Sequence, residues 1–117
     1  ESIYEGQTKV HPHANITGDR FPTSVLTGFK LDKHKLHPTQ KPVALCKWLV
    51  ETYTNQGDFV LDCFMGSGST VLACIQAGRQ YIGIEKDTPI YATASTRIQT
   101  AQAESEQKLK EEATAAQ

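Results

Sequence analysis

The segment from Val60 to Thr70, read as V-L-D-C-F-M-G-S-G-S-T, constrains the fold of this chain more than any other feature. A short apolar run ends in an acid, a glycine turn follows, and a helix-forming stretch begins directly after it. Gly66 and Gly68 lack a Cβ atom, so the backbone can turn sharply there and a ligand can lie against it. The unpaired N–H groups of the following helix favour a carboxylate or phosphate. The segment therefore predicts a strand, a ligand-binding turn and a helix.

Strands and helices are expected to alternate along the chain. The pattern predicts strands over 21–29, 59–62 and 80–85, and helices over 42–53, over 69–77 and from Asp87 or Thr88 onward. Pro42 suits the first turn of a helix, and Gly78 suits a helix end. The strand over 59–62 is short and apolar, as expected for a strand buried on both faces. This order predicts an α/β fold with a parallel sheet.

Two of the predicted helices have an apolar face. In the first, the residues at three- and four-residue steps are Leu45, Trp48, Leu49 and Thr52. In the last, the apolar face carries Ile90, Tyr91, Ala94 and Ile98. These positions predict the buried sides of the two helices, with Trp48 in the core. Beyond Gln99 only Leu109 is large and apolar, so a frayed or solvent-exposed extension is expected there.

Composition narrows the setting of the protein. The net charge is -1, but residues 1–50 carry seven basic and four acidic residues, whereas the rest carry five basic and nine acidic. The basic half could face an anionic partner. The three cysteines are odd in number and form no CxxC pair, which favours a reducing compartment over disulfides or a zinc site. Without a membrane-spanning stretch or signal peptide, a cytoplasmic protein is expected.

The ligand can be narrowed from the two acids that end the predicted strands. Asp62 follows its strand where open α/β sheets place ligands, although it could instead cap or stabilise the turn. Glu85 ends the next strand, and its carboxylate can accept hydrogen bonds from both hydroxyls of a ribose. Val71 interrupts the GxGxxG pattern of a dinucleotide site, and the lysine of a phosphate-binding loop is absent. The residues favour S-adenosylmethionine, whose carboxylate can meet the helix N-terminus.

Three motifs in order resemble the DNA amino-methyltransferases that modify adenine N6 or cytosine N4. The resemblance is to the permuted group in which the cofactor half follows the catalytic half. H-P-T-Q-K-P at 37–42 resembles motif X, and D-C-F-M-G-S-G-S-T at 62–70 resembles motif I. I-G-I-E at 82–85, with Tyr91 and 94–98, resembles motif II and its helix. The resemblance covers roughly 21–98, with Cys63 where the family often has proline.

This resemblance implies an S-adenosylmethionine-dependent methyltransferase Rossmann-like fold with a partial doubly wound sheet. Phe64 would pack near the adenine, the glycine turn would meet the methionine part, and motif X would close over the methionyl end. The implied cofactor-binding residues are Thr39, Gln40, Lys41, Asp62, Phe64, Gly66, Ser67, Gly68, Ser69, Thr70 and Glu85. The chain would divide into an irregular N-terminal arm (1–20), a cofactor-binding part (21–98) and a polar helical or frayed tail (99–117).

One motif of that family is missing. These enzymes hold the target amine in a D/N/S-P-P-Y/F/W loop, and no Pro-Pro pair occurs in this chain. We therefore expect no catalytic residue and no metal site here, and by family order the loop would precede Glu1. The implied function is the S-adenosylmethionine-binding portion of a site-specific DNA methyltransferase, inactive alone, with adenine N6 favoured over cytosine N4. The complete enzyme would act on double-stranded DNA as part of a restriction-modification system. Whether it forms a homodimer is left open by the sequence.

Other interpretations are kept beside this one. The chain could be a non-catalytic cofactor-binding or assembly module that needs a partner chain, while Val71 disfavours a dehydrogenase fragment. A basic group could contact DNA phosphates or form a solvated loop: Lys30, Lys33, His34, Lys35 and Lys41. His11 and His13 could bind a metal, although two histidines in an irregular arm usually bind nothing. His37 is expected to orient the motif X loop.

Overall fold

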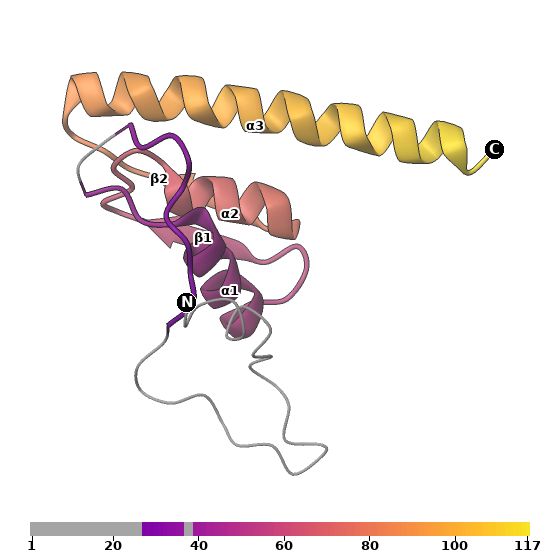
Figure 1. Cartoon of the computed structure of the whole chain (residues 1–117), viewed down its shortest axis with the longest axis horizontal. Helices are drawn as coiled ribbons and strands as arrows, with labels where there is room; N and C mark the ends of the chain where they lie inside the picture. Colours follow the sequence, from indigo (N-terminus) through magenta and orange to yellow (C-terminus); the bar gives the residue numbers. More distant parts are fainter. Residues whose placement is uncertain (1–26, 37–38) are drawn as a thin grey trace, which may run out of the picture.

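The computed structural model describes residues 27–36 and 39–117 of the chain. Its elements, in order, are α1 (Val43–Tyr53), β1 (Phe59–Asp62), α2 (Ser69–Ala77), β2 (Gln80–Gly83) and α3 (Thr88–Ala115) (Figure 1). The α/β class and these five elements agree with the sequence prediction. The strand expected over 21–29 is wrong in its described part, 27–29, where Gly28 has a φ of 97° that an extended strand cannot contain. The remainder of that prediction lies outside the described residues.

The two strands are parallel neighbours, and α2 is the crossover between them. Phe59 lies opposite Gln80, and Asp62 lies opposite Gly83. Backbone pairing continues past the strand ends, because Ile84 N donates to the Asp62 carbonyl at 2.9 Å. The carboxyl end of β1 and the residues that follow β2 therefore meet at one edge of the sheet, which places the two predicted ligand-binding acids together.

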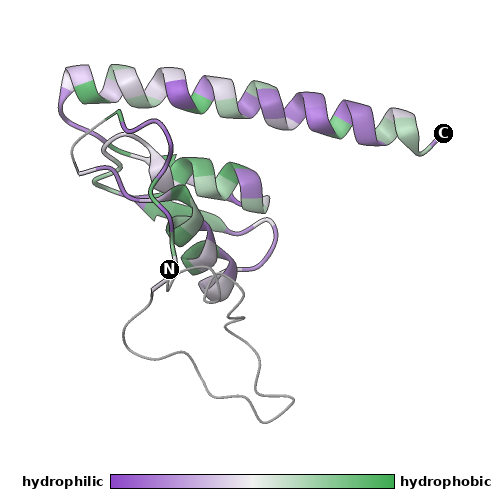
Figure 2. Ribbon diagram, viewed as in Figure 1, coloured by the Kyte–Doolittle hydropathy of each residue, from purple (hydrophilic) through white to green (hydrophobic). Residues whose placement is uncertain are grey.

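The core lies between the helices and one face of the sheet. Figure 2 shows the hydrophobic residues concentrated in α1, α2 and the strands. Val71 and Cys74 of α2 are the largest side chains that are almost completely buried. Val43 and Val50 of α1 pack against α2, together with other apolar residues of the core: Leu72, Ala73, Ala77, and the partly buried Val60 and Tyr81 from the strands. The crossover helix is thus the centre of the fold.

The buried face of α1 differs from the predicted one. Val43 and Val50 are its buried residues, whereas Leu49 is 39% exposed. Trp48 is half-buried and lies edge-on to Phe29, with the ring centroids 6.2 Å apart. The face turned toward α2 carries the smaller side chains, which let two helices approach closely where α2 presents alanine and cysteine. The larger residues, although correctly spaced for a helix face, lie to the side of this contact.

The other face of the sheet is open. We call the four apolar side chains on it the open face: Phe59 is 66% exposed, Leu61 60%, Ile82 52% and Ile84 50%. Successive residues of a strand point to opposite faces, so these four alternate with the residues that face the core. The prediction that 59–62 is buried on both faces is therefore wrong for the described residues, because their helices cover only one face.

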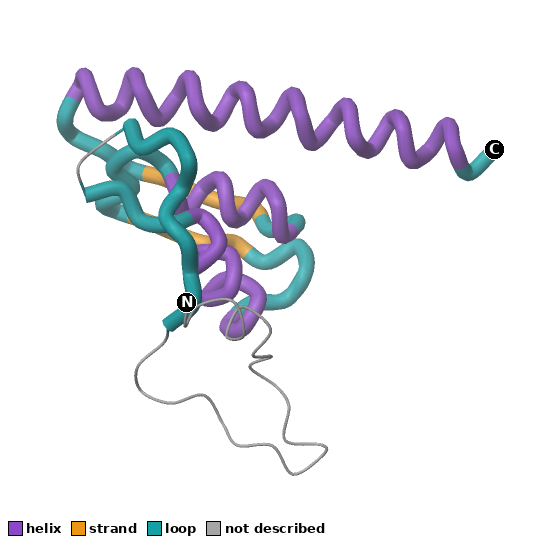
Figure 3. Tube along the Cα trace, viewed as in Figure 1, coloured by secondary structure: helices purple, strands orange, loops and turns teal. Residues whose placement is uncertain are grey.

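The last helix extends far beyond the core. It begins where Asp87 Oδ1 accepts a hydrogen bond from Ile90 N at 3.0 Å, with Pro89 in the first turn. Ala94 is fully buried and Ile98 packs beside it, but Tyr91 of the predicted face is 49% exposed. Figure 3 shows the helix continuing past the other elements to the C-terminus. No helix in the described part of the chain is long and apolar enough to cross a membrane.

Candidate functional site

The glycine turn between β1 and α2 makes the sharp change of direction that its sequence predicts. Gly66 has a φ of 56° and Gly68 a φ of 88°, in the left-handed region that favours glycine. Met65, which is buried, lies against β2. A Cβ atom added at Gly83 would lie 2.5 Å from Met65 Sδ and 2.9 Å from Val71. The absence of a side chain at Gly83 therefore lets the turn lie directly against the second strand.

Glu85 ties this turn to the start of α3. One carboxylate oxygen accepts a hydrogen bond from Gly66 N at 3.0 Å, and the other accepts from Asp87 N at 3.0 Å. The residue predicted to bind a ribose is thus also a support for the turn. Each carboxylate oxygen can accept more than one hydrogen bond, so both can still receive a hydroxyl group. Holding the backbone and binding a ligand are compatible roles for this side chain.

Asp62 has the turn-stabilising role that the sequence left open. Its Oδ1 accepts a hydrogen bond from Phe64 N at 3.0 Å, which fixes the first residues after β1. Phe64 is 90% exposed, although an aromatic side chain of this size is usually at least partly buried. The turn therefore presents a flat apolar surface at the carboxyl edge of the sheet, close to the two acids.

The N-terminus of α2 has no side-chain cap. Gly68 is its N-cap and has no side chain that could accept from the first N–H groups of the helix. A Cβ atom added at Gly66 would have nothing within 4 Å, so the space over that glycine is open. Backbone N–H groups at a helix N-terminus attract carboxylates and phosphates. The turn thus combines an open approach with a positive end of a helix.

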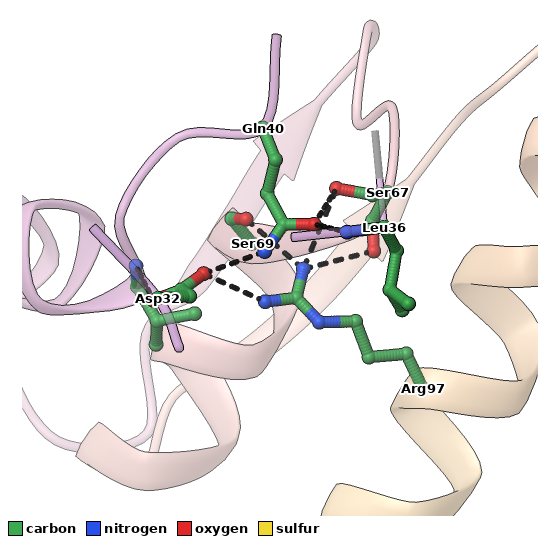
Figure 4. Close-up of polar contacts among 7 residues, drawn as sticks. Asp32, Leu36, Gln40, Ser67, Ser69 and Arg97 are labelled. Carbon is green, nitrogen blue, oxygen red and sulfur yellow. Dashed lines mark hydrogen bonds and ion pairs between the residues drawn. The ribbon is translucent and has the colours of Figure 1, made fainter. Parts of the chain in front are cut away.

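Three of the predicted polar residues are buried and face inward. Gln40 is 7% exposed, Ser67 4% and Ser69 5%. The Gln40 side-chain oxygen accepts from Leu36 N at 3.0 Å and from Ser67 Oγ at 3.4 Å. The structure therefore places these side chains in a network that joins the motif X segment to the glycine turn (Figure 4).

Two members of the network were given no role by the sequence prediction, although one of them, Arg97, lies in the 94–98 segment that resembles the helix after motif II. Arg97 of α3 and Asp32 form an ion pair with Nη2 and Oδ2 3.0 Å apart, and Arg97 also donates to Ser67 and Ser69. The available signals were a single acid within the basic stretch 30–41, and an arginine three residues after the buried Ala94. Neither signal identifies a partner, because the two residues lie far apart in the sequence.

The other predicted site residues lie around this network. Thr70 forms a hydrogen bond with the Cys46 thiol, so its hydroxyl faces α1. Burial raises the pKa of the Cys46 thiol, an effect opposed by that hydrogen bond, and burial also raises the pKa of the Cys74 thiol. Both thiols are therefore packing groups that stay protonated at neutral pH.

Thr39 and Lys41 are exposed, within the segment that resembles motif X.

The basic residues of the loop are solvent-exposed. Lys30, Lys33, His34 and Lys35 all lie on the surface, so their side chains are free to meet either water or a charged partner. Within 27–36 and 39–117, no three His, Cys, Asp or Glu side chains are grouped closely enough to hold a metal ion. The predictions for His11, His13 and His37 lie outside the described residues.

The sequence matches known methylases over most of its length. A family model described as DNA methylase matches residues 5–96. YubD of Escherichia coli (strain K12), a methylase by name, is 47% identical over 64 residues, which are 55% of this chain and 28% of that protein. The DNA adenine methyltransferase YhdJ of the same organism is 40% identical over 73 residues, 62% of this chain and 25% of that protein. This chain thus spans less than a third of the length of these relatives.

Solved structures share the fold. The crystal structure of the M1.HpyAVI–SAM complex matches with a TM-score of 0.56 and 42% identity, over 63% of this chain and 36% of that one. TTHA0409 of Thermus thermophilus, complexed with S-adenosyl-L-methionine, matches with a TM-score of 0.50 and 33% identity, over 52% of this chain and 26% of that one. The predicted S-adenosylmethionine-dependent methyltransferase fold is therefore confirmed.

Proposed function

Because this chain belongs to the DNA methylase family, we propose that it is the S-adenosylmethionine-binding portion of a site-specific DNA methyltransferase of the permuted order. The target would be the exocyclic amine of adenine N6 or cytosine N4. Adenine is favoured because one relative is named a DNA adenine methyltransferase. The observation that carries the proposal is the glycine turn, held by Glu85 and open over Gly66 at the N-terminus of α2.

The residues of the turn fit the parts of the cofactor. The N–H groups at the start of α2 would receive the methionine carboxylate, with Gly66 giving it room to approach. Glu85 would accept hydrogen bonds from the ribose hydroxyls with its remaining lone pairs. Phe64, which is almost fully exposed, would cover the adenine. Ser67 and Ser69 would contribute backbone groups, because their hydroxyls face Arg97.

Motif X would complete the methionyl end of the site. Gln40 would position this segment from its buried side, because it is buried and accepts a hydrogen bond from Ser67 Oγ. Lys41 and Thr39 lie on the exposed side of the same segment, where a lysine can pair with a carboxylate. When bound, the cofactor supplies an electrophilic methyl group on its sulfonium. The role of this chain is to bind and orient the donor, so the catalytic contribution is positioning.

The chain is proposed to work with a catalytic segment that carries the D/N/S-P-P-Y/F/W loop. That segment would bind the double-stranded DNA and hold the target amine, either in the same polypeptide or in a partner chain. The open face supports this, because four large apolar side chains on a two-stranded sheet are what a further part of an α/β domain would cover. The absence of a Pro-Pro pair also supports it.

Isothermal titration with S-adenosylmethionine tests the proposal. Binding at one site per chain is expected, either by the chain alone or by its complex with the catalytic segment. If neither binds, the proposed function is wrong. A second candidate, a non-catalytic assembly module, is favoured only by the open face. It predicts a coding sequence without a catalytic loop upstream of Glu1, and a complex whose methyl transfer does not depend on the glycine turn.

The Glu85→Ala substitution tests the assignment of the ribose. We expect the affinity for S-adenosylmethionine to fall by roughly 5- to 100-fold, because a charged acceptor worth about 1 to 3 kcal/mol is removed. Thermal unfolding should shift only modestly, since the freed Gly66 and Asp87 N–H groups can bond water. Glu106→Ala, an exposed acid of α3, is the control for the loss of one charge. Unchanged affinity, or an unfolded variant, would contradict a ribose-binding role.

A further inference from the structure

Arg97 joins three segments that are distant in the sequence: α3, the loop that begins at Asp32, and the glycine turn (Figure 4). We infer that Arg97 is a positioning residue that holds the methionyl end of the cofactor site, without touching the cofactor itself. The inference rests on the proposed function, because it assigns a role within the same site. It predicts that Arg97 affects binding of the methionyl part of S-adenosylmethionine and does not affect binding of the adenosine part.

The guanidinium of Arg97 reaches both sides of the site. Nη1 donates to the Ser67 carbonyl at 3.2 Å and to Ser69 Oγ at 3.1 Å, and lies 3.4 Å from Ser67 Oγ. Nη2 donates to Asp32 Oδ2 at 3.0 Å. The side chains of Arg97 and Asp32 are only 13% and 22% exposed. An ion pair this sheltered is screened less by solvent than a surface pair.

Asp32 extends this contact to Gln40 and to the start of α1. Its Oδ2 also accepts from Gln40 Nε2 at 2.7 Å, and its Oδ1 accepts from Val43 N at 3.1 Å. The same carboxylate thus binds the arginine, the buried glutamine and the first N–H group of α1. A negative charge at the N-terminus of a helix is favourable in its own right. Asp32 therefore links Gln40 and the N-terminus of α1 to Arg97.

Arg97 also fixes the turn that precedes α2. The Ser67 carbonyl and the Gly68 N–H belong to one planar peptide unit. On one side of this unit the carbonyl accepts from Arg97, and on the other the Gly68 N–H donates to the Met65 carbonyl at 2.9 Å. A lysine could not replace this arrangement, because its single ammonium cannot reach acceptors on both segments with a planar fork. We call Arg97 with its contacts to Asp32, Ser67 and Ser69 the clamp. The clamp therefore requires a guanidinium group.

The adenosine end of the proposed site is held by hydrogen bonds that do not involve Arg97. Phe64 N is bonded to Asp62, and Glu85 is bonded to Gly66 and Asp87, with no contact to Arg97 in any of these pairs. Loss of Arg97 should therefore loosen the loop and the turn that meet the methionyl part, and leave the groups that meet the adenosine in place. The effect should appear with S-adenosylmethionine and disappear with 5′-methylthioadenosine, which lacks the amino-acid part.

Arg79 provides a matched control at the opposite end of α2. Its Nε donates to Thr54 Oγ1 at 3.0 Å, its Nη1 to the Ala77 carbonyl at 2.5 Å, and its Nη2 to the Thr54 carbonyl at 2.8 Å. This arginine also joins α1 to α2 with several hydrogen bonds, but it lies away from the glycine turn. Its replacement should lower the stability of the fold without changing the preference for either ligand.

The titrations compare the wild-type chain with Arg97→Met, Arg97→Lys and Arg79→Met, each alone or, if only the complex binds, together with the catalytic segment. For Arg97→Met we expect about 10- to 100-fold weaker binding of S-adenosylmethionine, the range for charged hydrogen bonds, and less than about a two-fold change with 5′-methylthioadenosine. Arg97→Lys should fall between, and Arg79→Met should bind both as the wild type does. Equal losses for both ligands, or none with Arg97→Met, would overturn the inference. If neither the wild-type chain nor its complex with the catalytic segment binds S-adenosylmethionine, the proposed function is wrong instead.

A second measurement needs no ligand. The amides of Leu36 and Val43 donate to Gln40 and Asp32, so their hydrogen exchange reports on the clamp. Arg97→Lys, which keeps the charge, and Asp32→Asn, which keeps the shape, should each speed exchange at both amides. Arg79→Met should leave them unchanged relative to the rest of α1. If exchange at Leu36 and Val43 stays at the wild-type rate in the two clamp variants, Arg97 does not position this segment.

Discussion

The two faces of the sheet differ in how far their side chains are buried, although both are built from the same two strands. On the covered face, Val60 and Tyr81 pack into a core centred on α2, and Gly83 allows Met65 to lie against the strand. On the open face, the alternate residues are also apolar, yet each is at least half exposed. The chain therefore has enough apolar surface for two layers of helices, and its described elements supply one.

The difference separates two kinds of requirement. At the carboxyl edge of the sheet, as elsewhere among the described residues, every buried side-chain polar atom has a hydrogen-bond partner. The open face, in contrast, is apolar surface that none of the described elements covers, and a sheet of only two strands is marginally stable without such a cover. The groups proposed to bind the cofactor thus lie among the described residues, whereas the described helices leave one face of the sheet beneath them uncovered.

The largest effect should come from filling the covered face. In Gly83→Val, the new side chain meets Met65 and Val71, and overpacking of this kind costs about 1 to 3 kcal/mol or more. Ile82→Ala, one residue earlier on the open face, should cost well under the roughly 2 to 5 kcal/mol of a buried Ile→Ala change. Urea unfolding measures both. Similar costs for the two variants would show that the faces are equally covered in solution.

A smaller effect should follow from making the open face polar. Leu61→Ser with Ile82→Ser should change the free energy of unfolding of the isolated chain by about 1 kcal/mol or less, about 0.5 kcal/mol for each residue, since both are more than half exposed. The same variant should associate less with itself and with a catalytic segment, because apolar surface drives such contacts. Light scattering and co-purification provide the measurements. A marked loss of stability in the monomer would mean that some part of the chain already covers this face.

The smallest effect concerns the reactivity of the thiols. Cys63, which follows β1, is exposed, whereas Cys46 and Cys74 lie on the covered side. Burial raises the pKa of both covered thiols, so as pH rises their thiolates form later than that of an exposed thiol. At a pH of about 8, near the ordinary pKa of a free thiol, one thiol per chain should react rapidly with a maleimide, and peptide mapping should place it at Cys63. Fast labelling of Cys46 or Cys74 would indicate that the core opens.

Much of this arrangement follows from local sequence, and the exceptions share a cause. The bounds of β1 and α2, the left-handed glycines and the Asp87 cap are set by residues within a few positions of one another. The buried face of α1 was predicted wrongly because its spacing allowed two faces, and the choice depended on the small residues of α2. The open face was missed because an apolar strand gives no sign of how many helices will cover it.

The site divides in the same way. The predicted residues gather at the carboxyl edge because motif I and Glu85 each follow a strand of one parallel pair. Their division into groups that could meet a ligand and groups that support it could not be predicted. Ser67, Ser69 and Gln40 turn inward because of Arg97 and Asp32, which are 65 residues apart. A contact at that separation leaves no periodic or local pattern in the sequence.

The pairing of Asp32 with Arg97 also limits how the sequence can vary. Replacing either partner alone leaves the other as a sheltered charge without its counterion, which is more costly than replacing both. Two positions far apart along the described chain are therefore expected to covary. Related sequences are expected to keep both residues or to lose them together.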